Sequence, residues 1–545
     1  MLHIRDAADG SVVDTVDLVA ATALRDSLRA SSALSTQLLP VQKKPIGGIP
    51  NDFNYYPITV SGSTAIIHPR NHVLAYGKIY YVTIEPGVFV NAVGEAFAGI
   101  SDSTTWRFAT KSSGPAAGAT RLIVASDGSG DFDTIQGALD FVPAANTTPT
   151  TIFIKSGTYF EIVGFQQKHN LTILGEDAAT TVLTYPNNNT FNNISGVYHR
   201  SVLVAHSVRD LAVANLTIHN TTPQNGSQAE AIVINGPSAS ASRNLVTRCR
   251  FYSYQDTVQF NKQTYVSDSI IEGDVDFLWG DGPAFFENCD IRILRSNAYF
   301  TQIRNGSGNH GYVFRHCRFT APAGITGTFF GRIDPATFPF SEVVILDSTF
   351  GDAANNAFLA STTGASGSSY AAGWWLLNNT TSASSAPNVH NWTNSIVDVN
   401  GAPLVNPNGD AFTTMPSDAT LQANYRDPVW VLNTTLAGVA NGSWSPALAP
   451  LLLEQPEAAT VNAGESITLS VEALGVPALS FQWQKGGVDI SGATGATFTI
   501  PTAAASDSGS YRVVVSNTAG SSTSDAVVVT VLASETILVD DAFID

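Results

Sequence analysis

A short repeated unit in the middle of the chain restricts its fold more than any other feature. The unit is a small residue followed two positions later by Ile or Phe. It is found at Asn170–Ile173, Asn215–Ile218, Arg248–Phe251, Asp268–Ile271, Asn288–Ile291, His316–Phe319 and Asp347–Phe350. Consecutive copies start roughly 20 to 45 residues apart, with Gly and Asn turns between them. This spacing predicts a right-handed parallel β-helix, in which each coil buries one side chain inward and stacks on the next.

The three cysteines fall within this repeat. Cys249, Cys289 and Cys317 are an odd number and lack the paired spacing of a zinc site or a disulfide framework. We therefore expect buried thiols that form part of an internal ladder.

A helix is expected just before the repeat. In "DTIQGALDFVP", Ile135, Ala138, Leu139 and Val142 share one helical face. Such a helix would cap the open end of the β-helix.

Composition shifts divide the chain into an all-β fold with several domains. Residues 1–111 alternate polar and apolar residues in short runs and resemble a bacterial Ig-like β-sandwich that lacks its first strand. Residues 112–120 read as a linker, 121–447 as the β-helix, 448–533 as a second Ig-like β-sandwich, and 534–545 as a tail leading into a further segment.

The second sandwich resembles an I-set immunoglobulin domain. Trp483 matches the core tryptophan and Tyr511 the tyrosine corner. Val471 and Val513 stand where the two bridging cysteines should be, so the core is expected to hold by packing alone.

Charge and hydropathy exclude several kinds of partner. The formal net charge is −18, so there is no sequence-wide basic surface for nucleic acid or anionic membranes. No apolar run of about 18 residues predicts a membrane span. The N-terminus lacks the pattern of a signal peptide, and we attribute this to truncation of a longer protein.

The repeat also aligns two acidic residues. Asp256 lies seven residues after Cys249, and Asp276 lies seven after Ser269. Because successive coils are about 4.8 Å apart, the two carboxyl groups should face each other. Two carboxyls that close do not both ionise easily, which predicts one protonated and one ionised group.

Several motifs between Arg121 and Phe350 resemble the pectin methylesterase family, carbohydrate esterases with a pectin lyase-like β-helix. The motifs are "DGSGDFDTIQGALDFVP" (127–143), "IFIKSGTYFE" (152–161), "LTILGED" (171–177), "GSQAEA" (226–231), "YQDTV" (254–258), "GDVDFLWGDGPAFFENC" (273–289) and "FFGR" (329–332). They follow the order in which the family has them.

The resemblance implies a role for each matching residue. Asp276 would be the nucleophile, and Asp256 would protonate the departing methanol and then activate water. Gln228 and Gln255 would donate hydrogen bonds to the oxyanion, and Arg332 would hold the nucleophile ionised. The alternatives are a turn residue for Gln228 and a surface ion pair for Arg332.

The surroundings of this set depart from the family. Ile333 and Asp334 replace the Pro and the substrate-stacking Trp that follow "GR", and Gln259 replaces an aromatic residue. Trp279 is either a core residue, which we favour, or a platform for substrate. With Arg332 and Gln228 it completes the expected substrate-binding set.

These features together predict a pectinesterase acting on methyl-esterified pectin or a related uronate polysaccharide. An esterase for another decorated polysaccharide or a thioester, a polysaccharide lyase or hydrolase, and a non-catalytic carbohydrate-binding β-helix stay as alternatives. No metal or cofactor is implied, and we expect activity to survive EDTA. We expect a secreted or cell-surface protein, whose Ig-like modules bind glycan, bind the cell surface or act as spacers.

Overall fold

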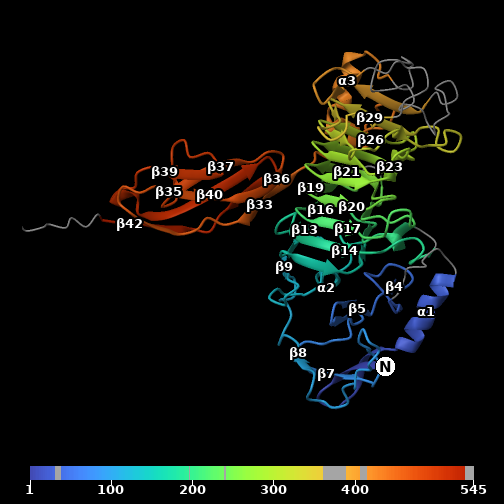
Figure 1. Ribbon diagram of the computed structural model, residues 1–545. Coiled ribbons are helices and arrows are strands. Elements are labelled where there is room, and N and C mark those ends of the chain that lie inside the picture. The colour runs from blue at the N-terminus through green and yellow to red at the C-terminus, as the bar shows by residue number, and fades with distance from the viewer. Residues whose placement is uncertain are drawn as a thin grey trace, which may run out of the picture. The chain divides into compact units, whose positions relative to one another are not determined.

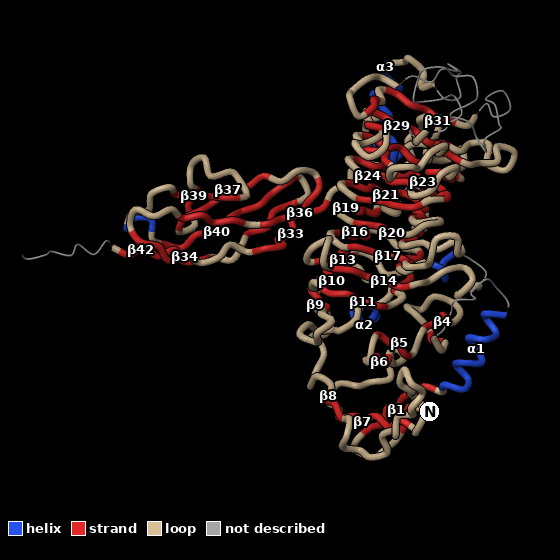
Figure 2. Tube along the Cα trace, in the orientation of Figure 1, coloured by secondary structure: helices blue, strands red, loops and turns tan. Residues whose placement is uncertain are grey.

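The computed structural model describes residues 1–30, 39–194, 197–238, 241–356, 358–359, 388–404 and 414–533. The chain forms two compact units, Met1–Trp444 and Ser445–Asp545 (Figure 1). The expected tail 534–545 lies outside the described residues. Strands and loops dominate both units, and helices are few (Figure 2).

Most of the first unit is a parallel β-helix, as the repeat predicted. One face is a nine-stranded parallel sheet. Its strands in order are β11 (Gly157–Phe160), β14 (Thr181–Tyr185), β17 (Thr217–Asn220), β20 (Arg250–Tyr252), β22 (Ile270–Gly273), β24 (Asp290–Ile293), β27 (Arg318–Thr320), β30 (Thr349–Phe350) and β32 (Val397–Asp398).

A 15-stranded sheet supplies the remaining faces as two rows of parallel strands. The first row is β9 (Arg121–Val124), β10 (Thr150–Ile154), β13 (Leu171–Gly175), β16 (Leu211–Ala214), β19 (Asn244–Thr247), β21 (Val258–Ser267), β23 (Val275–Glu287), β26 (Tyr312–Arg315), β29 (Glu342–Leu346) and β31 (His390–Asn394). The second row is β12 (Val163–Gln166), β15 (Leu203–His206), β18 (Ile232–Asn235), β21, β23, β25 (Tyr299–Ile303) and β28 (Phe329–Gly331). The long strands β21 and β23 take part in both rows and join them.

The repeated unit has a clear structural meaning. Its first residue has a positive φ between 49° and 58° in all seven copies, so it turns the chain at a corner before the next strand. Six copies then enter the nine-stranded sheet, whereas Asn170–Ile173 enters the other sheet through β13. The Ile or Phe that ends each copy is 0% exposed, which confirms the inward position expected for it.

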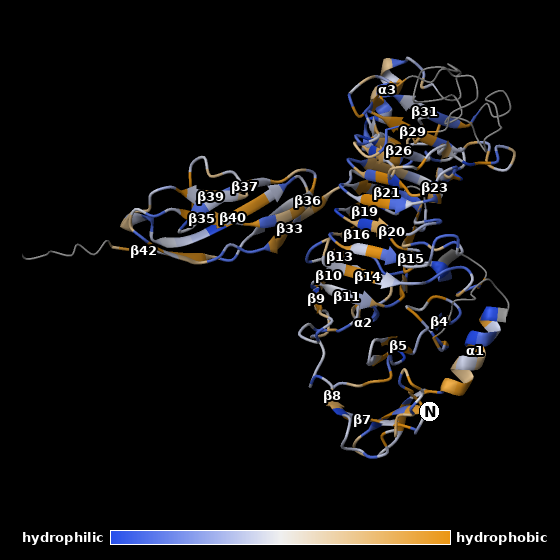
Figure 3. Ribbon diagram, in the orientation of Figure 1, coloured by the Kyte–Doolittle hydropathy of each residue, from blue (hydrophilic) through white to orange (hydrophobic). Residues whose placement is uncertain are grey.

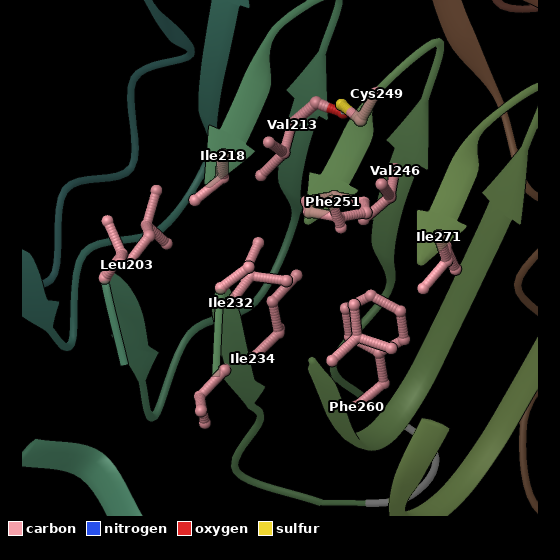
Figure 4. Packing of buried hydrophobic residues seen from close by; sticks show 14 of the residues in the cluster. Leu203, Val213, Ile218, Ile232, Ile234, Val246, Cys249, Phe251, Phe260 and Ile271 are labelled. Carbon is pink, nitrogen blue, oxygen red and sulfur yellow. The ribbon is translucent and has the colours of Figure 1, made fainter. Parts of the chain in front are cut away.

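The interior of the coils is a continuous hydrophobic stack (Figure 4). Cys249, Cys289 and Cys317 are free thiols and each is 1% exposed, as expected. Ser269 and Ser348 share their column, and their hydroxyls accept from the N–H groups of Cys249 and Cys317 at 3.1 and 3.0 Å. Hydrophilic and hydrophobic residues alternate on the strands around this core (Figure 3).

Helix α2 (Ile135–Phe141) lies at the start of the β-helix, against β9, β10 and β12. The Thr134 hydroxyl caps it by accepting from the N–H of Gly137 at 3.2 Å. The predicted apolar face is buried, since Ile135, Ala138 and Leu139 are at most 1% exposed. The carboxylate of Glu161 accepts from the N–H groups of Ile135 and Gln136 at this end.

The N-terminal region differs from the single sandwich expected over 1–111. Strands β1 (Leu2–Asp6), β2 (Val12–Val16), β7 (Ile79–Ile84) and β8 (Arg107–Ala109) form an antiparallel sheet, and two small hairpin-like sheets are made by β3 (Gln42–Lys44), β4 (Phe53–Tyr55), β5 (Ile58–Ser61) and β6 (Thr64–Ile67). The 13-residue helix α1 (Leu18–Ala30) was not predicted, although Ala21, Leu24 and Leu28 lie along one face of it and the two leucines pack against the β-helix core.

Part of this region packs on the β-helix instead of forming a core of its own. Ile46, Ile49 and Phe53 are buried in the β-helix core. Asn54 and Asn192 exchange backbone and side-chain hydrogen bonds at 2.7 and 3.2 Å. A local alternation of polar and apolar residues carries no information about such a distant partner.

The last part of the first unit consists of α3 (Ala419–Tyr425) and α4 (Pro428–Asn433), of which α4 packs on β21 and β23. Buried His310 connects this part to the coils, since its ring bonds Glu342 at 2.9 Å and Thr434 at 3.0 Å. Among the described residues, no helix combines the length and hydrophobicity needed to cross a membrane.

The second unit is a sandwich around Trp483. Its strands are β33 (Leu448–Glu454), β34 (Ala459–Asn462), β35 (Ile467–Ser470), β36 (Glu472–Val476), β37 (Ser480–Lys485), β38 (Val488–Asp489), β39 (Thr497–Ile500), β40 (Gly509–Asn517), β41 (Gly520–Thr523) and β42 (Val527–Leu532). Strand β34 pairs parallel with β42, and the other strand pairs are antiparallel. Tyr511 donates to the carbonyl of Asp507 at 2.8 Å, which confirms the tyrosine corner. Val471 and Val513 are buried beside Trp483, so the core packs without a bridge at those positions.

Candidate active site

Three carboxyl groups lie level with one another on neighbouring coils. Val258 pairs with Ile232 on one side and with Leu278 on the other, which sets Asp256 level with Glu230 and with Asp276. The N–H of Asp256 donates to the carbonyl of Val275 at 3.0 Å. Asp256 and Asp276 therefore occupy equivalent positions on successive coils, as expected. Glu230 is a third acidic residue in the same column of side chains.

Both aspartates have a strained backbone. The φ of Asp256 is 65° and that of Asp276 is 52°, in the left-handed region that non-glycine residues seldom adopt. Both residues stand just before or at the start of a long strand, where the chain turns into β21 and β23. The corner residues of the repeat have a similar positive φ, so this backbone conformation alone does not distinguish the site from other turns of the β-helix.

Asp276 has two unlike carboxylate oxygens. Arg332, which directly follows β28, donates from Nη2 to Oδ2, and Gln302 on β25 donates to the same oxygen at 3.1 Å. Its Oδ1 is buried and has no hydrogen-bond partner among the described residues. The side chain is thus held at one oxygen, while the other makes no hydrogen bond to the described residues.

Asp256 is held by a different arginine. Arg200, at the end of the 3₁₀ helix Val197–Arg200, donates from Nη2 to Oδ2 of Asp256 at 2.8 Å. The same guanidinium makes three hydrogen bonds of 2.6 to 2.9 Å to both oxygens of Glu230. Glu230 is 0% exposed, so this pair lies deep under the site.

Burial shifts the titration of both aspartates. Removal from water raises the pKa of Asp276 to about 7 and that of Asp256 to about 6, while neighbouring arginines oppose the rise. The ionised Asp256 further raises the pKa of Asp276. Both pKa values thus lie near neutrality, and titration of the two groups as a coupled pair stays a prediction.

Trp279 is buried between arginines. It is 4% exposed, and the guanidinium groups of Arg200 and Arg304 lie 5.4 and 5.1 Å from its ring centre. Arg304 also lies 5.5 Å from the ring of Phe338. The ring is therefore buried, as the favoured core interpretation expects, and it supports two of the cations of the site.

Gln228 and Gln255 lie beside the carboxyl column. Both are half-buried, and the N–H of Ala229 donates to the carbonyl of Gln255 at 3.1 Å, which brings their strands together. The Oε1 atom of Gln228 accepts from the Ser227 hydroxyl at 3.0 Å. All five predicted catalytic residues thus come from this one face of the β-helix.

Sequence reasoning missed four residues of the site, namely Arg200, Glu230, Gln302 and Arg304. Glu230 stands within the quoted motif "GSQAEA", two residues after Gln228, but a longer coil hides its register with Asp256. Gln302 pairs with Trp279 across β23 and β25, a relationship visible only once strand pairing is known. Arg200 carries no repeat signal because it lies in a short 3₁₀ helix between coils.

Neither of the two residues directly after Arg332 is aromatic. Ile333 is 3% exposed, and the exposed Asp334 accepts from the N–H of Ala336 at 3.0 Å and from Thr337. Among the described residues there is no cluster of three His, Cys, Asp or Glu side chains that could hold a metal ion.

Comparison with known proteins gives consistent matches. The family model described as Pectinesterase matches residues 121–389, and that of the immunoglobulin I-set domain matches residues 450–531. Pectin methylesterase from carrot, a solved structure, is 21% identical, covers 57% of this chain and 92% of its own, and has a TM-score of 0.43.

Two curated relatives come from Arabidopsis thaliana. Pectinesterase 31 is 33% identical over 240 residues, which are 42% of this chain and 72% of that protein. Probable pectinesterase 56 is 32% identical over 251 residues, 43% of this chain and 83% of that protein. Identity of this degree over most of the length of both relatives shows that the chain belongs to the pectinesterase family of ester-hydrolysing enzymes.

Proposed function

We propose that this chain hydrolyses methyl esters of uronate residues in pectin, giving methanol and a free carboxylate, with Asp276 as the nucleophile. The observation that carries the proposal is the asymmetry of Asp276. Arg332 and Gln302 bind Oδ2, and buried Oδ1 has no partner among the described residues. A carboxylate oriented in this way can direct one oxygen at an ester carbon.

In the first step Oδ1 of Asp276 forms a bond to the ester carbon. The tetrahedral group then loses its methoxy oxygen, which takes the proton of Asp256, and methanol leaves. An acyl anhydride now joins Asp276 to the sugar. This step needs Asp276 ionised and Asp256 protonated. Burial raises the pKa of both groups, to about 7 for Asp276 and about 6 for Asp256, so the step uses the less populated placement of their shared proton, which the Arg332 guanidinium favours by lowering the pKa of Asp276.

In the second step Asp256 takes a proton from water, and the oxygen of that water attacks the acyl carbon. The bond to Asp276 breaks and its electron pair returns to the carboxylate. The sugar leaves as a carboxylic acid that ionises in solvent, and Asp256 again carries a proton. One ester and one water thus give one acid and one methanol.

The tetrahedral oxyanion of each step needs donors that are already in place. Gln228 and Gln255 lie on the edge next to Asp256, and we assign their side-chain amides to this task. Arg332 serves both Asp276 and the anionic polymer, and Trp279 serves binding by fixing Arg200 and Arg304.

A second candidate is another ester on a decorated uronate polysaccharide. The observation that favours it is the loop after Arg332, where Asp334 binds its own loop and supplies no ring for a sugar to stack on. The catalytic groups would be the same, and only the leaving alcohol or acyl group would differ.

Pectin lies outside the cytoplasm, and we accordingly place the enzyme at the cell surface or in the medium. Fractionation of the native host with an antibody to this chain tests the location. A purely cytoplasmic signal would contradict it.

The substrate is tested by product analysis. Purified chain and its Asp276→Ala variant are incubated with pectin that carries both methyl and acetyl esters, and methanol and acetate are measured. Methanol release by the parent alone supports the proposal. Acetate without methanol would replace it with the second candidate.

A further inference from the structure

Glu230 has no task in the mechanism above, although it is a fully buried acid at the site. It stands level with Asp256, one coil away, in the same column as Asp276. Removing a carboxylate and a guanidinium from water is costly, and such pairs seldom add stability over packed hydrophobic residues. A charged pair at this position therefore calls for a role other than stability.

Arg200 links Glu230 to the proposed acid. It makes three hydrogen bonds to Glu230 and one, at 2.8 Å, to Oδ2 of Asp256. One positive charge can balance only one of two buried carboxylates. The fork-like contact with both oxygens of Glu230 favours the negative charge there, against the burial that raises the pKa of Glu230 to about 8, and so favours the proton on Asp256.

The other charged groups around Asp256 come from separate elements. Asp274 and Asp276 belong to the turn into β23 and its start, Arg304 follows β25, and Arg332 follows β28. Arg332 is bound to Asp276, and Arg304 is stacked on Trp279. Arg200 donates a hydrogen bond to Asp256 directly. The charge of Glu230, the other partner of Arg200, therefore determines how strongly Arg200 stabilises the ionised form of Asp256.

The short helix that carries Arg200 is itself supported from the N-terminal region. The ring of His199 donates from Nε2 to the carbonyl of Pro50 at 2.8 Å, and its centre lies 4.4 Å from that of Phe53. The guanidinium is thus fixed from one side by this packing and from the other by Glu230.

We infer that Glu230 is a positioning residue for the proposed esterase reaction: acting through Arg200, it holds the Asp256 carboxyl group in place and neutralises the positive charge beside it. Without Glu230 the guanidinium would favour the ionised form of Asp256, and the acid needed for methanol departure would be lost at a lower pH. The inference rests on the role proposed for Asp256.

The test follows the protonation of Asp256 in the full-length chain by infrared difference spectroscopy between pH 4 and 9, with D256N used to identify its carboxyl band. In E230Q the charge of Arg200 is unbalanced, so Asp256 should titrate lower by about one pH unit or more. In the double variant R200M/E230M both charges are gone, and Asp256 should titrate no lower than in the parent.

The matched control is D210N. It breaks the ion pair between Arg243 and Asp210, another arginine–carboxylate fork of the β-helix. The Asp210 side chain is 30% exposed, and neither residue belongs to the site. This variant should leave the titration of Asp256 unchanged. The basic limb of methanol release should move with the infrared titration in each variant.

Equal titration of Asp256 in E230Q and the parent would overturn the inference, and so would a downward shift in R200M/E230M. The infrared titration needs no ester substrate. If the parent releases no methanol, the proposed function fails, while the titration still decides whether Glu230 controls Asp256.

Discussion

Asp256 and Asp276 stand level on adjacent strands, both with a positive φ, and the N–H of Asp256 reaches back to the carbonyl of Val275 at 3.0 Å. This stacking brings two carboxyl groups into one buried site, where each disfavours ionisation of the other. A different arginine binds each of the two aspartates. Arg332 binds Asp276 and opposes the rise of its pKa, while Arg200 binds both Asp256 and Glu230.

The pH dependence follows from this pair. Burial raises the pKa of Asp256 to about 6 and that of Asp276 to about 7, and the active form carries one proton between them. Activity should rise as the pair loses its first proton and fall as it loses the second. We expect kcat/KM for methanol release to be bell-shaped, with both limbs between about pH 5 and 8. A flat profile across this range would contradict the assignment.

Loss of Arg332 should affect Asp276 in two ways. In R332M the carboxylate loses its charged partner, so its pKa rises and the acidic limb moves to higher pH by about one unit or more. We expect kcat to fall about 100-fold. R318M, which breaks the exposed pair between Arg318 and Asp290, is the matched control and should keep parental kinetics. Equal kinetics of R332M and R318M would contradict a role for Arg332 in the reaction.

The β-helix could be predicted because successive coils contribute copies of the same short sequence unit. The corner residue with positive φ and the inward Ile or Phe recur in every copy, and both are required by the geometry of each coil. The repeat did not distinguish the two sheets, so Asn170–Ile173 was grouped with copies that lie on another face. Helix α1 and the packing of Phe53 on the coils depend on distant contacts that local patterns do not contain.

The site was predictable to the extent that its coils are equally long. Asp256 and Asp276 are 20 residues apart, as are Phe251 and Ile271, which pair across β20 and β22, so counting aligned them. Glu230 belongs to a longer coil, and counting failed there. Arg200 contacts the carboxyl column from a short 3₁₀ helix outside the repeat, and nothing in the neighbouring sequence distinguishes it from a surface arginine.

Trp279 should matter for stability as well as for the site. W279A removes a buried ring and frees Arg200 and Arg304, and it should destabilise the first unit by about 3 to 5 kcal/mol. W279F keeps a smaller ring and should therefore cost less than W279A. Calorimetry of the melting transition of the β-helix measures both, and equal effects would show that the ring has no packing role.

The three thiols should be inert in the native protein. Burial raises the pKa of Cys249 to about 12 and that of Cys289 well above its usual range, so no reactive thiolate forms at pH 8. A thiol reagent such as DTNB should label Cys249, Cys289 and Cys317 only after unfolding in denaturant. Rapid labelling of the folded chain would place at least one of them outside the internal ladder.

The central claim is that Asp276 is the nucleophile, and a pair of variants on one strand tests it most directly. D276N and D281N both lie on β23, and Asp281 forms an ion pair with Lys262 instead of facing the site. The account predicts that D276N loses methanol release from methylated pectin by about 10³-fold or more, while D281N keeps the parental rate. A D276N variant that releases methanol as fast as D281N would contradict it.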